Sequence, residues 1–176
     1  MNLKLTPLLF STIFTTTFTA IVLTLGWRST AIAELQEDLR RLLNTKQCQQ
    51  CDLSEANLAE AELSGADLLG ANLQKANLSG AQLRGVDLSS ANLIGADLSG
   101  ADLRDAKLHT TNLREANLTG ADLSWSDLYQ AFLENAQLKQ ANLSNANLNN
   151  ARLEGANFCG AILPDGKVGE CPGSQN

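Results

Sequence analysis

Leucine recurs at every fifth residue along most of this chain, a period that neither an α-helix nor a β-strand has. From Leu53 to Leu163 there are 23 positions in steps of five, and leucine fills 22 of them. Five residues on a helix advance about 500°, so each leucine is displaced by ~140° from the last and no apolar face forms. On a flat strand, an odd spacing sends alternate leucines to opposite faces. The chain must therefore turn within every repeat, with the leucines pointing into a coil.

The residues around each leucine are equally regular. Alanine stands two positions before it in 19 of the 23 repeats, and Asn or Asp stands one position before it in 16. Small or polar residues follow, as in ADLSG at 96–100. The uniform alanine indicates a narrow interior in which a larger side chain would overpack. Asn, Asp, Ser and Gly suit turns and outward-facing positions.

This A(N/D)LXX pattern runs without interruption over about two-thirds of the chain and resembles the pentapeptide-repeat proteins, in particular exported ones of cyanobacterial type. The resemblance implies an all-β fold, a right-handed four-sided parallel β-helix with four repeats per coil. Residues 20 apart would then stack on one another. The resemblance also implies a structural or protein-interaction role rather than catalysis.

The first segment, 1–33, has the features of a signal peptide. An early lysine, Lys4, precedes an apolar and Thr-rich stretch from Leu8 to Leu25, and Ala31-Ile32-Ala33 offers a small-x-small cleavage site. The alternative is an uncleaved membrane anchor, because the apolar stretch is long enough to span a bilayer. For a chain with a leader, the family resemblance implies export to the thylakoid lumen or the periplasm.

Three further segments follow the leader. Residues 34–47 are expected to form a short N-terminal capping α-helix, because four leucines make an amphipathic stripe: Leu35, Leu39, Leu42 and Leu43. The alternative for this segment is a linker from a membrane anchor. Residues 48–163 are expected to form the β-helix, and 164–176 a C-terminal capping tail that begins at a Pro-Asp-Gly turn signal.

The four cysteines fall into two pairs. In the stacked coils that the resemblance implies, Cys51 and Cys159 lie ~25 Å apart, so the four cannot share one metal ion. Exported chains favour oxidised cysteines, and we therefore predict a Cys159–Cys171 disulfide that holds the tail. For Cys48 and Cys51, a structural disulfide, two free thiols and a redox-active C-x-x-C all remain open. The motif follows the predicted helix, whereas a reactive thiol usually lies at a helix N-terminus.

Charge and composition argue against several function classes. The net charge is -6, which gives no electrostatic reason to bind nucleic acid or an anionic membrane surface. Membrane contact is expected only through an uncleaved leader. His109 is the single histidine and lies in an outward position, where a solvated side chain is expected. No nucleophile–base pair can be named. We expect no enzyme activity, cofactor, metal site or small-molecule substrate.

Outward residues can be sorted by the expected stacking of positions 20 apart. Like charges then meet in two columns, with Asp67 over Asp87 and Asp102 over Asp122, while Lys107 interrupts the first of these before Asp127. Stacked carboxylates repel at this spacing. The prediction is a solvated acidic face, and a weak cation site is the alternative.

Three aromatic residues break the polar pattern of the outward positions. Trp125, Tyr129 and Phe132 replace the usual small or polar residues in neighbouring repeats. Exposed aromatics on a polar rod indicate a partner patch. Packing against a local bulge is the alternative. The leading hypothesis is thus a non-enzymatic interaction module with an unidentified protein partner. The family resemblance implies a second hypothesis, a DNA-mimicking protein that acts on gyrase. A third hypothesis is a thiol–disulfide redox protein that uses Cys48 and Cys51.

Overall fold

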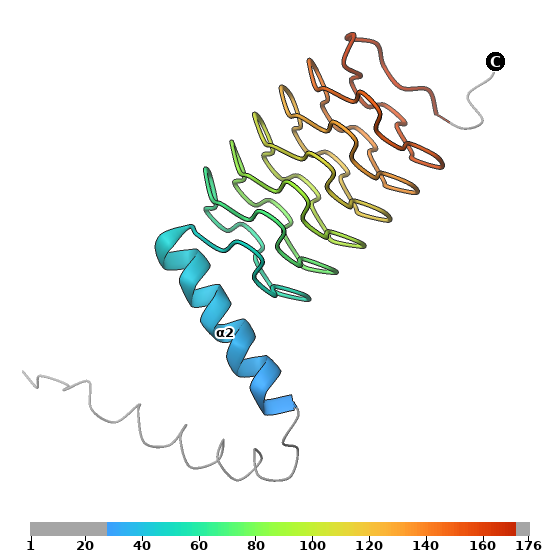
Figure 1. Ribbon diagram of the computed structural model, residues 1–176. Helices are drawn as coiled ribbons and strands as arrows, with labels where there is room; N and C mark the ends of the chain where they lie inside the picture. The colour runs from blue at the N-terminus through green and yellow to red at the C-terminus, as the bar shows by residue number, and fades with distance from the viewer. Residues whose placement is uncertain (1–27, 172–176) are drawn as a thin grey trace, which may run out of the picture.

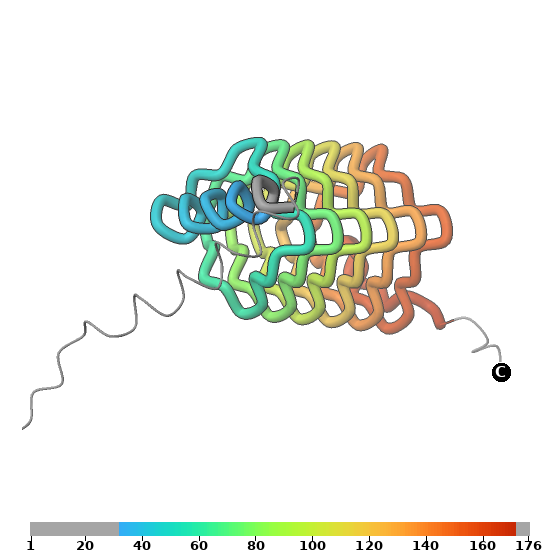
Figure 2. The backbone as a smooth tube through the Cα atoms, turned by 90° about the horizontal axis from the view of Figure 1, so that it is seen from below, coloured from blue at the N-terminus to red at the C-terminus, as the bar shows by residue number. Residues whose placement is uncertain are grey.

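The computed structural model describes residues 28–171 and shows a helix followed by a rod of stacked coils (Figure 1). The helix, α2, spans Arg28–Thr45. Parallel bridges then join the residue before each leucine to the residue 20 positions later, from Gln47↔Asp67 to Asn142↔Ile162. Each coil therefore contains four five-residue repeats, as the family resemblance implied, and equivalent positions line up along the rod (Figure 2).

A turn at every fifth residue produces this path. The amide of each alanine donates to the carbonyl of the preceding leucine, as from Ala101 to Leu98 at 3.1 Å. The fifth residue has a positive φ, which is 65° at Gly100 and 62° at Trp125. Glycine adopts this conformation at little cost, and other residues pay a modest strain. Because the chain turns so often, the described part of the rod has single-residue bridges where longer strands would otherwise form.

The interior of the rod is filled by the leucines and alanines. Leu98 and Ala101 are each 1 % exposed, and the same holds along most of the rod. Two alanine positions carry buried hydroxyls instead. Thr111 donates to the carbonyl of Leu88 at 2.8 Å, and Ser126 donates to that of Leu123 at 2.7 Å. Both polar groups are therefore satisfied inside the apolar core.

The Asn and Asp residues before the leucines form ladders on the outside. The side-chain oxygen of Asn142 accepts the amide N–H of Ser144 at 3.1 Å, while its amide group donates to Asp122 in the previous coil at 3.1 Å. The first bond is the turn role that the sequence indicated. The second bond, which ties neighbouring coils together, was not foreseen from the sequence.

The stacking of charged residues follows the prediction. Asp67 pairs with Asp87, Asp102 with Asp122, and Lys107 with Asp127. Cations relieve part of the repulsion, since Lys107 Nζ lies 3.3 Å from a carboxylate oxygen of Asp87 and Arg104 pairs with Asp102.

Several carboxylates in these ladders have a lowered pKa. The hydroxyl and amide of Ser54 lower the pKa of Asp52, and hydrogen bonds from Arg104 lower that of Asp102. Burial raises the pKa of Asp127, but hydrogen bonds from His109 and the Tyr129 amide outweigh it, so the pKa is lowered.

Because these folded-state pKa values lie below the unfolded ones, the carboxylates stabilise the rod above the unfolded pKa. That contribution is lost as the pH falls through the folded values. We expect the free energy of unfolding in urea to be steady between about pH 7 and 5 and to fall below about pH 4. The decrease should be smaller in an Asp102→Asn, Asp127→Asn double variant. Equal pH profiles for this variant and the wild type would contradict the assignment.

The N-terminal end of the rod is covered by α2. Leu42 is fully buried, and Leu35 and Leu39 are half-buried against the core. Leu43, which the sequence placed on the same stripe, is 58 % exposed. Adjacent residues on a helix differ by about 100°, so Leu42 and Leu43 cannot both face the first coil.

The bounds of α2 differ from the expected segment 34–47. The helix starts at Arg28, inside the segment assigned to the leader, and ends at Thr45. The proposed cleavage after Ala33 would remove its first residues. Residues 1–27, which hold the rest of the leader, lie outside the described residues. Within 28–171, no helix has the length and apolar character needed to cross a bilayer.

The C-terminal tail covers the other end of the rod on one side. After the last repeat the chain reverses, and Ile162 forms an antiparallel bridge with Val168. The amide of Leu163 donates to the carbonyl of Lys167 at 2.7 Å, and that of Gly169 donates to the carbonyl of Ala161 at 2.8 Å. The tail thus adds one short antiparallel strand to the last coil.

Candidate functional site

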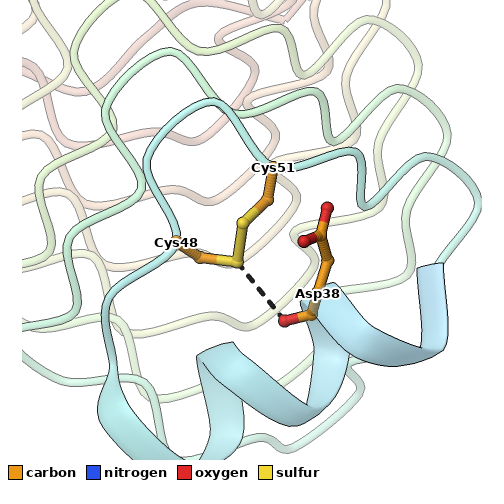
Figure 3. Close-up of side chains that lie close together, drawn as sticks. All are labelled: Asp38, Cys48 and Cys51. Carbon is orange, nitrogen blue, oxygen red and sulfur yellow. Dashed lines mark hydrogen bonds between the residues drawn. A yellow bond between two sulfur atoms is a disulfide. The ribbon is translucent and has the colours of Figure 1, made fainter. Parts of the chain in front are cut away.

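The first candidate site lies where α2 meets the first coil. Asp38 on α2 faces Cys48 and Cys51, which form a disulfide (Figure 3). The sulfur of Cys48 lies 3.3 Å from the backbone oxygen of Asp38. Both cysteines are buried, at 1 % and 2 % exposure.

The repeat itself explains why a C-x-x-C spacing gives a disulfide here. Cys48 occupies the leucine position of residues 46–50, and Cys51 occupies the alanine position of the next repeat. These two positions point inward on either side of a turn, and the Cα atoms of the two cysteines are 5.3 Å apart. The motif therefore fits as a covalent replacement for a Leu–Ala contact at the start of the core.

Charged groups of α2 surround this disulfide. Arg41 Nη2 lies 2.6 Å from Cys51 Sγ and 2.8 Å from a carboxylate oxygen of Asp38. The other carboxylate oxygen of Asp38 accepts the amide N–H of Asp52 at 2.9 Å. The cluster joins the helix to the first coil by polar contacts as well as by the leucines. The contact between Arg41 and Cys51 could not be predicted from the sequence, because the two residues are ten positions apart and lie in different elements.

This arrangement supports a structural role better than metal binding or thiol exchange. One ligand atom from each of Asp38, Cys48 and Cys51 lies within 4.8 Å of the others. Metal binding needs thiolates, however, whereas these sulfurs are joined and Arg41 places a positive charge beside them. Thiol exchange needs access to a sulfur atom, and both sulfurs are covered.

The second cysteine pair lies at the opposite end. Cys159 and Cys171 form a disulfide that links the end of the described tail to the outward face of the last coil. Both pairings that the sequence suggested are therefore present in the structure, in two separate places. Each disulfide therefore cross-links the chain at one end of the rod.

The three aromatic residues lie on three successive sides of one coil. Trp125 is 65 % exposed and Tyr129 is 37 % exposed, whereas Phe132 is half-buried. Arg114 and Arg152 cover the two faces of the Phe132 ring, with their guanidinium carbons 4.7 Å and 5.1 Å from its centroid. Phe132 is thus held in a cation–π stack, and the exposed aromatic surface consists of Trp125 and Tyr129.

His109 lies beside this surface. Its Nε2 is 2.6 Å from a carboxylate oxygen of Asp127, and its ring meets that of Tyr129 edge-on with centroids 6.2 Å apart. The histidine is almost half exposed. This geometry orders the surface around Tyr129 and brings no nucleophile to the histidine among the described residues.

The fold and the sites define a repeat solenoid with a helix over one end and a short tail along one side of the other. Pentapeptide repeats match residues 51–89, 81–120, 96–135 and 126–165, eight copies in all, which together cover more than half of the chain. The chain belongs to the pentapeptide-repeat family. No curated protein matches it.

Solved structures of the same family are similar. HetL, a protein involved in heterocyst differentiation regulation from the cyanobacterium Nostoc sp. PCC 7120, is 38 % identical with a TM-score of 0.53. The match covers 70 % of this chain and 62 % of HetL. Rfr23 from the cyanobacterium Cyanothece 51142 is 32 % identical with a TM-score of 0.52, and the match covers 69 % of this chain and 93 % of Rfr23. This chain therefore spans less than two-thirds of HetL.

Proposed function

We propose that this protein is a non-enzymatic interaction module whose rod presents a protein-binding surface. The exposure of Trp125, at 65 %, carries this proposal. Large exposed aromatic side chains are enriched at protein interfaces and contribute strongly to binding when they become buried. Tyr129, on the next side of the same coil, is 37 % exposed, and we define Trp125 and Tyr129 as the aromatic surface. Phe132 lies on the neighbouring side and is covered by Arg114 and Arg152.

We further propose that the rod is a right-handed, four-sided parallel β-helix that works in the thylakoid lumen or the periplasm. The parallel register of 20 residues supports the fold. The leader-like sequence and two disulfides, which persist in oxidising compartments, support the localisation.

The charge distribution favours a protein partner over DNA mimicry. A DNA mimic needs negative charge spaced regularly along the rod, as it is along a duplex. Between Glu34 and Asp67 there are eight acidic and three basic residues, while 68–171 holds eleven acidic and eight basic ones. The acidity is therefore concentrated at the N-terminal end.

Affinity capture from the exported compartment tests the aromatic surface. We expect a Trp125→Ala, Tyr129→Ala double variant to lose proteins that the wild type retains. The loss should correspond to about 2 kcal/mol or more of binding free energy if both rings anchor a partner. The measurement is quantitative mass spectrometry of the retained proteins.

Two controls make the capture specific. Leu69→Ala removes an apolar side chain that is 39 % exposed in an earlier coil and should retain the same proteins as the wild type. A Phe132→Ala variant removes only the ring that Arg114 and Arg152 cover, so it tests whether this cation–π stack contributes to binding. If the double variant and the wild type recover the same proteins in equal amounts, the aromatic surface is not the binding site.

A further inference from the structure

The last layer of the core, at the C-terminal end of the rod, is open to solvent, unlike every other layer. The inward residues of the last coil are Leu148, Leu153, Phe158 and Leu163. Leu153 is 36 % exposed and the other three are half-buried, whereas their equivalents one coil earlier are fully buried. Together with part of the tail they line a hollow of about 570 Å³.

The backbone at this end is also incomplete. On two sides, 146–150 and 151–155, none of the groups that point away from the rod has a partner within residues 28–171, and on a third side, 156–160, the Phe158 amide and the Ala156 carbonyl have none there. In the preceding coil, Leu133 and Asn135 donate their amides to Arg152 and Glu154, and Ala131 accepts from Arg152. The equivalent groups of the last coil have no partner within residues 28–171. On one side they are the amides of Leu153 and Gly155 and the carbonyl of Ala151. On the other side they are the amides of Leu148 and Asn150 and the carbonyl of Ala146. An unpaired edge of this kind is a template for another strand.

The tail shows how such an edge accepts a strand. Lys167 to Gly169 run antiparallel to the last repeat and pair with it through two backbone hydrogen bonds, which involve Ala161 and Leu163, and a third bond joins the Gly160 amide to the Gly169 carbonyl. The two open sides, 146–150 and 151–155, carry the same pattern of donors and acceptors as the side that the tail covers. An extended segment therefore fits them in the same antiparallel geometry. The five residues after Cys171 read Pro-Gly-Ser-Gln-Asn, and they offer no aliphatic side chain other than proline for the hollow.

A second copy of this chain does not complement the edge. Each open side offers two amide donors and one carbonyl acceptor. An identical edge brings the same surplus of donors, and unpaired donors removed from water are costly. The acidic residues at this end also oppose self-association, since Glu154 and Glu170 have no cationic partner within the described residues.

We propose that the C-terminal end of the rod binds an extended, apolar segment of a partner protein as an added antiparallel strand. Alternate side chains of that segment fill the hollow between Leu148 and Leu153, and a flanking lysine or arginine pairs with Glu154 or Glu170. Strand addition of this type derives affinity from main-chain bonds and specificity from pockets for alternate side chains. The proposed site is separate from the aromatic surface, so either proposal can fail without the other.

Binding of synthetic peptides tests this site. The probes are acetylated heptapeptides with a lysine at each end, in which Val, Leu, Ile or Phe alternates with Thr. Isothermal titration to the disulfide-intact protein is expected to show saturable binding of at least one peptide. N-methylation of the peptide amides, which blocks strand pairing, is expected to weaken that binding at least tenfold.

Matched variants locate the binding. Leu153→Lys should weaken it at least tenfold, whereas Leu69→Lys, at a similarly exposed leucine in an early coil, should leave it unchanged. Far-UV circular dichroism checks that both variants fold. Absence of binding by every probe would overturn the proposal, and so would equal affinity for the N-methylated peptides. Sedimentation that shows a wild-type dimer and a monomeric Leu153→Lys variant would assign the end to a second copy, which also overturns it.

Discussion

Deletion of residues 99–118 is expected to leave a folded rod that is one coil shorter, whereas deletion of residues 99–120 is expected to destabilise the rod severely or to divide its unfolding into two transitions. The first deletion removes 20 residues, which is the register of the parallel bridges. Leu98 is then followed by Thr119 and Gly120, so the turn after it is preserved. Each remaining repeat finds an equivalent neighbour, as expected for a protein stabilised by contacts between adjacent repeats.

The second deletion removes only two more residues but joins Leu98 directly to Ala121. The two turn residues of one repeat are then missing, and the chain cannot change direction before the next side. We expect a loss of about 4 kcal/mol or more in the free energy of unfolding, or two separate transitions. Urea unfolding followed by circular dichroism measures both proteins. Similar single transitions for the two deletions would show that the turn residues do not fix the coil.

Truncation of a leucine in the middle of the rod is expected to cost far more than the same truncation at its C-terminal end. Leu103 is 1 % exposed and has complete coils on both sides, so Leu103→Ala leaves a cavity that the surrounding walls cannot fill. Such changes cost about 2–5 kcal/mol. Leu153 occupies the same position of its repeat but is 36 % exposed. Leu153→Ala should therefore cost less than about 1.5 kcal/mol.

The comparison controls for chemistry, because the substituted residue and its place in the repeat are the same. Guanidinium unfolding at constant pH gives both values. Equal losses would mean that the end of the rod is covered in solution. Such a result would also test the proposed strand-binding site, because a bound strand or a second copy would bury Leu153.

Several functional features lay within reach of the sequence. The leucine period predicts the inward positions, and the 20-residue register that the family resemblance implies correctly stacks Asp102 on Asp122. The two cysteine pairs could be separated by their distance along the rod, and the structure contains a disulfide at each end. The aromatic residues stood out from the repeat, but the sequence could not show that Arg114 covers Phe132 while Trp125 stays exposed.

The sequence by itself determined the repeating part of this protein, because each five-residue unit encodes its own turn and its own inward side chain. Such units can stack with leucine over leucine in any register that is a multiple of five residues, and the family resemblance implied the register of 20 that the parallel bridges show. Tertiary structure alone decided the ends, where the period stops and no neighbouring repeat dictates the contact. There, the approach of α2 buries Leu42 but not Leu43 and brings Arg41 to Cys51. The reversal of the tail pairs one side of the last coil and leaves Leu153 at an open edge.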